Sequence, residues 1–216
     1  MLTFGITLLI ISMSLMLIVS ILQDPEEIFF NKETIKPLED AEINNFNPNS
    51  NSGGSEYLHI GEQLLGHSRS FIKFKIPSKI NPIQKAIIRT YWYSLICNSY
   101  LSIKVHIVSN EWSEKNITWN NAPSYGTEIT SEDITDGMEF NIDITDYISN
   151  SSELSICILE QSPYCTYGLQ SDSKEGGGYN SPKLMIQYQG ISIELGLFIF
   201  SLILMVLGTI GIIHQK

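Results

Sequence analysis

One short run of the sequence has the residue types and the spacing of a sugar-binding surface. Arg89, Tyr91 and Tyr93 stand two positions apart within residues 87–93, a stretch rich in β-branched and aromatic residues. Alternate residues of a β-strand point to the same face of a sheet, so these three share one face and Trp92 takes the other. Exposed aromatic rings can stack on sugars, whereas tyrosines on strands also serve plain packing. The three are therefore candidate ligand-binding residues of a glycan platform, with packing as the alternative.

A second candidate site is a cluster of acids around Gly137. Carboxylate oxygens are the hard ligands that calcium prefers. The spacing of the four acids is not that of an EF-hand, so calcium binding and a solvated acidic turn both stay open. No other cofactor is predicted. The candidate metal ligands are Glu132, Asp133, Asp136 and Glu139.

The motifs of common enzyme classes are not found. The histidines at 59, 67, 106 and 214 do not have metal-ligand spacing. There is no G-x-S-x-G turn, and the glycines at 176–178 lack the Lys and Ser/Thr of a phosphate-binding loop. Two carboxylates can still meet in a fold and act as acid and base. We expect a protein that is not an enzyme, with no catalytic residue to name.

Cysteines and glycosylation patterns offer candidate modification sites. Cys97, Cys157 and Cys165 allow one disulfide and leave one thiol over. A predicted turn separates Cys157 from Cys165, which makes them the first candidate pair, and Cys97 with either is the alternative. Asn116 and Asn150 each begin an Asn-x-Ser/Thr acceptor pattern, which matters in a host that glycosylates it.

Both ends of the chain are predicted to be membrane segments. Residues 2–22 contain no charged residue, and residues 195–213 are interrupted only by Ser201, Thr209 and glycines. About 20 apolar residues cross a hydrocarbon core of about 30 Å. For the first segment a cleaved signal peptide is the alternative, although no basic residue precedes it. Lys216 follows the second segment and, by the positive-inside tendency, places the C-terminus in the cytoplasm.

These segments divide the chain into four parts. We expect a transmembrane anchor or signal peptide over 1–23, a linker rich in acids and prolines over 24–40, a β-sandwich over 41–189, and a transmembrane helix with a short cytoplasmic tail over 190–216. The predicted localisation is the cell membrane, with the sandwich domain extracellular.

The middle of the chain has the period of β-strands. Apolar and polar residues alternate in 72–76 and 101–107, and further short strands are predicted at 87–93, 139–144, 154–159 and 184–188. Clusters of Asn, Ser, Gly, Asp and Pro separate them. No sustained helical period occurs between residues 57 and 189. The pattern predicts an all-β fold, an antiparallel sandwich or barrel.

Charge is distributed unevenly. The chain has 13 Lys and Arg against 23 Asp and Glu, a formal net charge of −10, which argues against nucleic acid as a partner. Basic residues dominate from Arg69 to Lys104, and acids dominate from Glu111 to Glu160. A basic face would attract anionic polysaccharide, while the plain interpretation is a solvated surface.

Eight groups of residues follow one another in a recognisable order. They are Arg69 to Phe74 with Ile76 and Pro77, Tyr91 to Tyr93, Val105 and Val108, Trp112 to Glu114, Ile117 to Pro123, Phe140 with Asp143 to Thr145, Ser171 to Glu175, and Pro182 to Tyr188. The series resembles the DNRLRE domain family over residues 41–189. The resemblance implies a jelly-roll-like antiparallel β-sandwich and a carbohydrate-binding module of bacterial or archaeal surface and secreted proteins. Ser173, Lys174 and Glu175 are the nearest counterpart of the six-letter string that names the family.

Several of the matching residues have a structural interpretation. Trp112 and Trp119 are expected to anchor the sandwich core, because each buries a large apolar area. Asp143 and Thr145 suit a junction between strand and turn.

Two functions remain. The first is a surface-displayed binding module for glycan or cell-envelope polysaccharide. The alternative is a structural or adhesion membrane protein that contacts a surface protein.

Overall fold

The computed structural model describes residues 30–63, 65–80, 82–93, 100–148, 152–162, 168–189 and 201. The chain divides into two compact units, residues 1–32 with 188–216 and residues 33–187. Apart from Ser201, the two predicted membrane segments lie outside the described residues. Within the described ranges no helix is long and apolar enough to cross a bilayer. Both membrane segments therefore stay predictions.

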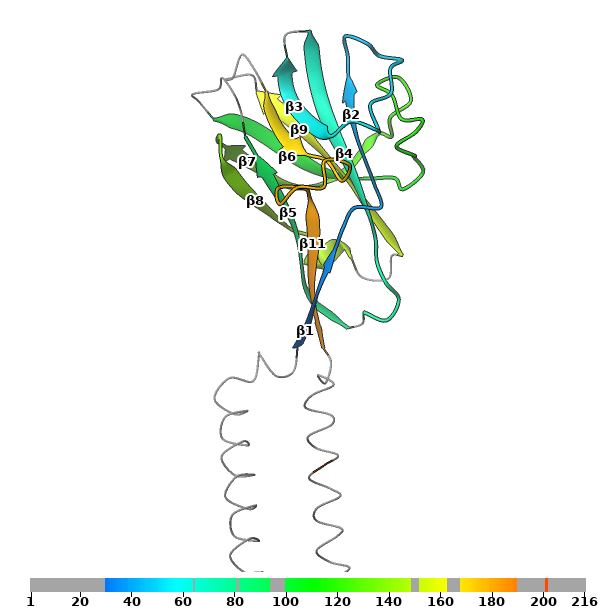
Figure 1. The fold of residues 1–216 in the computed structure, drawn as a ribbon, viewed down its shortest axis with the longest axis vertical. Helices are drawn as coiled ribbons and strands as arrows, with labels where there is room; N and C mark the ends of the chain where they lie inside the picture. The colour runs from blue at the N-terminus through cyan, green and yellow to red at the C-terminus, as the bar shows by residue number, and fades with distance from the viewer. Residues whose placement is uncertain are drawn as a thin grey trace, which may run out of the picture. The chain divides into compact units, whose positions relative to one another are not determined.

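The described residues form two β-sheets (Figure 1). The smaller sheet has the order β1 (Phe30–Ile35), β11 (Lys183–Gln189), β5 (Ile83–Trp92) and β8 (Met138–Asp143). The larger sheet runs through β10 (Leu169–Asp172), β3 (Tyr57–Gln63), β4 (Gly66–Lys75), β9 (Glu153–Ser162), β6 (Leu101–Val108) and β7 (Tyr125–Ile134), with β2 (Glu39–Asn44) also paired to β4. A short helical turn, η1 (Thr145–Tyr147), follows β8. The prediction of an all-β antiparallel sandwich is confirmed.

The smaller sheet shows the alternation that the sequence predicts. In β5 the even-numbered residues from Ala86 to Trp92 are buried and the odd-numbered ones are partly exposed. The strand pairs antiparallel with β8, so that Thr90 lies opposite Phe140. The buried indole N–H of Trp92 donates to the hydroxyl of Thr90 at 2.8 Å. Each large side chain buried in this way contributes roughly 1.5–3 kcal/mol. The buried face of this sheet therefore forms one wall of the core between the two sheets, which we call the main core.

The larger sheet is buried on both of its faces along β4. Residues 70–74 are all buried, which alternation alone does not predict. The even-numbered side chains, such as Ile72 and Phe74, continue the main core. The odd-numbered ones lie beneath the β6–β7 loop, residues 109–124, and form a second core with it. That core contains Ala41, Ile43, Phe71, Val108, Trp112, Ile117 and Cys157, with Trp119, Ala122 and Leu159 packed against it.

Trp112 and Trp119 are therefore packing residues, but they do not anchor the core between the two sheets, where the sequence predicts them. Trp112 packs edge-on against Phe71, with ring centres 5.8 Å apart, and its indole N–H donates to Ser155 at 3.1 Å. Trp119 packs at the margin of the same cluster. Both lie on the outer face of the larger sheet rather than between the sheets. The reason is that the β6–β7 loop folds back over its own sheet, which no periodicity in the loop could reveal.

The sandwich also begins earlier than the sequence indicated. Residues 24–40 were expected to be a linker, yet they contain β1, and β2 starts at Glu39. β1 lies at a sheet edge and is only half buried, so its sequence lacks a clear apolar face. β7 and β10 were missed for a related reason, since β7 is largely exposed and β10 has only 4 residues.

One edge of the larger sheet is irregular. β7 is the last strand of that sheet, and its pairing with β6 shifts register between Val105 and His106 and again between His106 and Val108. Such irregularities are typical of sheet edges. Most of the side chains of β7 are exposed, including those of Glu128, Glu132 and Asp133.

Candidate functional site

The outer face of β5 carries the predicted aromatic residues side by side. Tyr91 and Tyr93 have ring centres 6.3 Å apart, and their planes are inclined by 40°. Both rings are half-buried, whereas Trp92 points into the main core and is fully buried. Arg89 lies on the same face, where its guanidinium is 3.6 Å from the Glu139 carboxylate. The alternation in the sequence thus placed these three side chains on the outer face.

A third tyrosine joins this face from a loop. Tyr179 lies between β10 and β11 and is 76% exposed, more than the other large hydrophobic residues described. The Arg89 guanidinium lies 5.3 Å from its ring centre, and the Lys183 ammonium lies 4.9 Å from it. We call Arg89, Tyr91, Tyr93 and Tyr179 the tyrosine platform. The hollow between Tyr91 and Tyr179 measures only about 10 Å³, so no deep pocket opens between these two side chains.

Sequence reasoning missed Tyr179 because the loop around it has no periodicity. The residue follows Gly176 to Gly178, which predict only a flexible turn. Its neighbours on the platform come from β5, far away in the chain. A lone aromatic residue in a glycine-rich loop was the one available signal.

Polar groups at the edge of the platform form a connected chain. The Tyr93 hydroxyl donates to Asp172 at 2.9 Å and accepts from the Gln170 amide at 3.1 Å. The Gln170 carbonyl oxygen lies 3.0 Å from Nε2 of His59, whose Nδ1 lies 2.6 Å from Glu42. Burial raises the pKa of Tyr93, and the neighbouring Asp172 raises it further. The phenol is therefore neutral and keeps its proton for hydrogen bonding.

The contacts of His59 in this chain of hydrogen bonds favour its protonated form. Burial by itself lowers the pKa of His59, but the hydrogen bond and the charge of Glu42 outweigh it, so the pKa lies above the ordinary value of 6.5. Both ring nitrogens face acceptor oxygens, which suits an imidazolium with two N–H donors.

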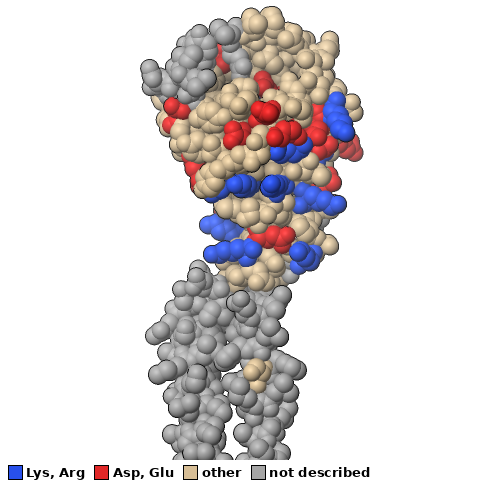
Figure 2. Space-filling view, in the orientation of Figure 1, with Lys and Arg blue, Asp and Glu red and all other residues tan. Residues whose placement is uncertain are grey.

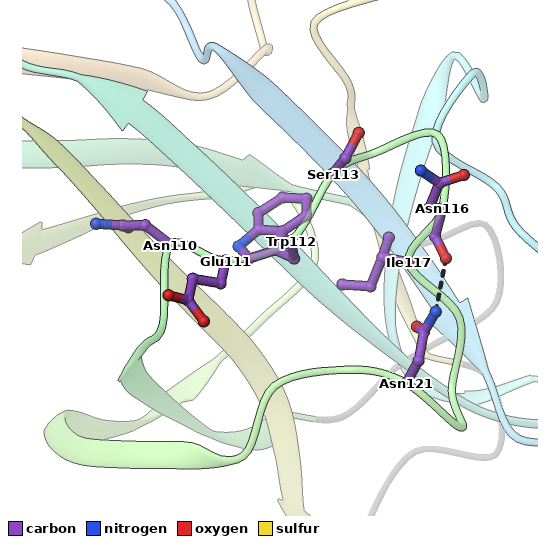
Figure 3. A pocket seen from close by; sticks show the side chains of 7 residues that line it. All are labelled: Asn110, Glu111, Trp112, Ser113, Asn116, Ile117 and Asn121. Atoms are coloured by element: carbon purple, nitrogen blue, oxygen red, sulfur yellow. Dashed lines mark hydrogen bonds between the residues drawn. The ribbon is translucent and has the colours of Figure 1, made fainter.

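A larger pocket lies in the β6–β7 loop (Figure 3). It measures about 460 Å³ and is lined by Asn110, Glu111, Trp112, Ser113, Asn116, Ile117 and Asn121. The Asn121 amide donates to the Asn116 carbonyl oxygen at 2.9 Å across one wall. Trp112, the single aromatic residue of this lining, is buried against Phe71 and has its indole N–H bonded to Ser155. The ring therefore packs the loop and offers no open face for stacking.

The four candidate calcium ligands are not brought together. No group of three or more His, Cys, Asp or Glu side chains among the described residues is arranged to hold a metal ion. Asp133 accepts a hydrogen bond from Ser102, and Glu139 pairs with Arg89. Glu132 accepts from Thr130 at 3.2 Å. The acids of this region, Asp136 among them, are thus spread along β7, the turn and β8.

The candidate modification sites are only partly described. Asn116 is exposed in the β6–β7 loop, as an acceptor of glycosylation must be, whereas Asn150 lies outside the described residues. Cys157 is a free thiol buried in the second core. Burial raises its pKa. The predicted partner Cys165, like Cys97, lies outside the described residues, and the structure shows no disulfide from Cys157 to either.

A buried ionic cluster fixes the loop of residues 173–175. Asp40 is 1% exposed and accepts a hydrogen bond from the backbone N–H of Lys174 at 2.8 Å. The Lys174 ammonium lies 2.6 Å from the Glu114 carboxylate and also contacts Glu175. Burial raises the pKa of Asp40 to about 7, although the hydrogen bond from Lys174 opposes this and the charge of Glu175 adds to it. The cluster joins β2, the β6–β7 loop and the loop before β11.

The fold and the aromatic face together define a class of protein, the β-sandwich binding modules. The comparison with protein families agrees, because residues 31–188 match the model of carbohydrate-binding module family 96. The match covers more than two thirds of the chain and starts within β1, the first strand of the sandwich described above. The chain belongs to carbohydrate-binding module family 96. No curated protein is significantly similar to it in sequence.

Proposed function

We propose that this chain is a non-catalytic module that binds a polysaccharide on the tyrosine platform. The observation that carries the proposal is Tyr179, which is 76% exposed beside Tyr91 and has the Arg89 and Lys183 cations 5.3 Å and 4.9 Å from its ring centre. Exposed apolar clusters on a protein surface commonly mark binding sites, whereas single exposed apolar residues need no explanation. Membership of a carbohydrate-binding family points to glycan as the ligand.

The shape of the platform favours an extended chain of sugars. Its hollow of only about 10 Å³ cannot enclose a sugar ring, but the platform can lie beneath several sugar rings of one chain. The apolar faces of the sugars would stack on the tyrosines, and their hydroxyls would bond to Arg89, Gln170 and Asp172 at the edge. Each aromatic contact contributes on the order of 1 kcal/mol, so affinity depends on several contacts together.

The charge of the surface favours acidic groups on that chain. On the face drawn in Figure 2, most Lys and Arg side chains gather toward the end of the described domain where β1 lies, while Asp and Glu are more frequent toward the other end. Arg89 and Lys183, on β5 and β11, lie beside Tyr179. An acidic polysaccharide would be drawn to these cations although the whole chain is negative.

The test is binding of the full-length chain to neutral and acidic polysaccharides by affinity electrophoresis, in calcium and in EDTA. We expect the double variant Tyr91→Ala, Tyr93→Ala to weaken binding about tenfold or more, since two contacts of about 1 kcal/mol are lost. Tyr147→Ala is the matched control, because Tyr147 is a half-buried tyrosine of η1, which contacts the other end of β5 through Ala86. Unchanged binding in the double variant would refute the platform.

We also propose that the two apolar terminal segments hold the module at the outer surface of a membrane. The support is their length and hydropathy in the sequence. Protease added to intact cells should remove the β-sandwich while the membrane fraction retains the C-terminal segment. Recovery of the chain in the soluble fraction would contradict this part of the proposal.

A further inference from the structure

The outer face of the larger sheet carries a smaller polar pocket, separate from the platform. It measures about 220 Å³ and lies between the end of β2, the start of β4, the end of β9 and the β6–β7 loop. We call it the Glu160 pocket. Its lining includes Asn45, His67, Arg69, Trp119, Glu160 and Gln161.

Glu160 contributes an acceptor that the protein leaves unused. Its side chain is only 8% exposed, and Oε2 lies 3.2 Å from Nδ1 of His67. The other oxygen, Oε1, is buried and has no hydrogen-bond partner among the described residues. An unsatisfied buried acceptor costs about 1–3 kcal/mol, and more when it is charged. A ligand hydroxyl that donates to Oε1 would remove this cost.

Amide groups in the same lining supply donors. The Asn45 side-chain oxygen accepts from the His67 backbone N–H at 2.8 Å, and the Gln161 side-chain oxygen accepts from Ser131 at 2.7 Å. Each amide therefore keeps its NH₂ group for a further partner. A sugar hydroxyl both donates and accepts, so a carboxylate oxygen next to amide donors is the set that such hydroxyls require.

Arg69 and Trp119 give the pocket a rigid wall. The guanidinium lies 3.9 Å from the centre of the indole ring, and 5.3 Å from the Tyr125 ring. One face of the indole is thus covered by Arg69, and because Trp119 also packs against the second core it is not an open stacking surface. Recognition in this pocket rests on hydrogen bonds, in contrast to the platform.

We propose that the Glu160 pocket binds a single neutral sugar ring, such as the end of a glycan chain. The volume of about 220 Å³ equals about seven water molecules at roughly 30 Å³ each and lies below the roughly 300–1,000 Å³ of pockets for larger ligands. An acidic sugar is disfavoured because its carboxylate would face the unpaired oxygen of Glu160. This inference rests on the proposed function for its ligand class, but it uses other residues on another face.

Trp119 provides the reporter for a test. Of the three tryptophans, Trp92 and Trp112 are buried, so Trp119 alone is accessible to solvent. The full-length chain is titrated with methyl glycosides of glucose, galactose, mannose and xylose while the three indole N–H signals are followed by NMR. We expect one glycoside or more to move the Trp119 signal saturably at or below about 50 mM, a range that corresponds to weak binding. Glucuronic acid should bind at least about tenfold more weakly.

Variants separate the pocket from the platform. Glu160→Gln should weaken the glycoside about tenfold, since a hydrogen bond to a charged group is lost. Gln161→Ala, at an exposed position, should weaken it severalfold without risk to folding, which the unmoved Trp112 signal verifies. The Tyr91→Ala, Tyr93→Ala variant should bind the glycoside normally.

The outcomes are distinct. A Trp119 signal that no glycoside moves, or a shift that persists in both Glu160→Gln and Gln161→Ala, overturns the pocket. If polysaccharide binding still depends on Tyr91 and Tyr93 in that case, the platform stands and the pocket alone is wrong. If glycosides bind in a Glu160-dependent manner while the tyrosine variant binds polysaccharide normally, the platform alone is wrong.

Discussion

Lys73 and Trp112 are joined by two contacts at once. The ammonium lies 4.6 Å from the centre of the indole ring and donates a hydrogen bond to the backbone carbonyl oxygen of Trp112. The same ammonium bonds to Glu39 of β2 at 2.5 Å. Lys73 is only 4% exposed, so three segments of the chain meet at one buried charge. The pair fastens the β6–β7 loop to the outer face of the larger sheet.

Removal of that charge should loosen the loop. Lys73→Met keeps the apolar stem but leaves Glu39 without its cation and the Trp112 carbonyl without the Lys73 donor. We expect the free energy of unfolding to fall by about 2–3 kcal/mol, because a largely buried pair is broken. Denaturant titration measures the loss, and the fluorescence of Trp112 should shift to the red. Lys75→Met, at the exposed end of β4, is the control and should change stability by less than about 0.5 kcal/mol.

The raised pKa of Asp40 predicts that the folded chain is more stable in mild acid. Its pKa is raised to about 7 from an ordinary 3.8, so the folded chain holds a proton that the unfolded chain releases. The free energy of unfolding therefore rises as the pH falls through 7, by about 1.4 kcal/mol from this group between about pH 8 and pH 6. Asp40→Asn keeps the acceptor for Lys174 and should flatten this dependence in thermal melts. A variant with the full wild-type dependence would contradict the assignment.

His59 makes a contribution of the same sign through a different contact. Its pKa is raised above 6.5, so its stabilisation is complete below pH 6.5 and is lost as the pH rises through the folded pKa. We expect His59→Gln to lower Tm at pH 5.5 and to have a smaller effect at pH 9. Because Gln170 links His59 to Tyr93, the same variant should also weaken polysaccharide binding severalfold. Equal losses of Tm at the two pH values would show that packing, rather than charge, explains the effect.

Tyr179 tests whether stacking or the hydroxyl group matters on the platform. Tyr179→Ala should reduce affinity for polysaccharide about five- to tenfold, since one aromatic contact of about 1 kcal/mol disappears. Tyr179→Phe keeps the ring beside Arg89 and Lys183 and should bind almost as the wild type does. Isothermal titration distinguishes the two. A Phe variant as weak as the Ala variant would contradict stacking.

The sequence was most informative where neighbouring residues follow a single strand. Period two placed Tyr91 and Tyr93 together and Trp92 inside, and it identified the junction in which Thr145 donates twice to Asp143. It was least informative where a loop covers a sheet. Lys73 alternates like a surface residue, and only the β6–β7 loop above it makes it buried.

The candidate sites could likewise be predicted where their residues share a strand and could not where a loop brings residues together. Arg89, Tyr91 and Tyr93 could be predicted because they share one strand, whereas Tyr179 reaches the platform from a loop. The Glu160 pocket was invisible in the sequence for the same reason. Glu160 and Arg69 lie on β9 and β4, and Trp119 comes from the β6–β7 loop, so their meeting depends on tertiary contacts.

The irregular edge at β7 bears on how molecules of this protein behave when crowded. A regular edge strand offers unpaired backbone groups to a neighbouring copy and invites aggregation by strand addition. Here the register shifts disturb the ladder, and Glu128, Glu132 and Asp133 line the strand with negative charge. Two copies that approach through β7 would repel each other. Dense arrays of the module can thus stay free of cross-β association, with each copy keeping its own surface open to solvent.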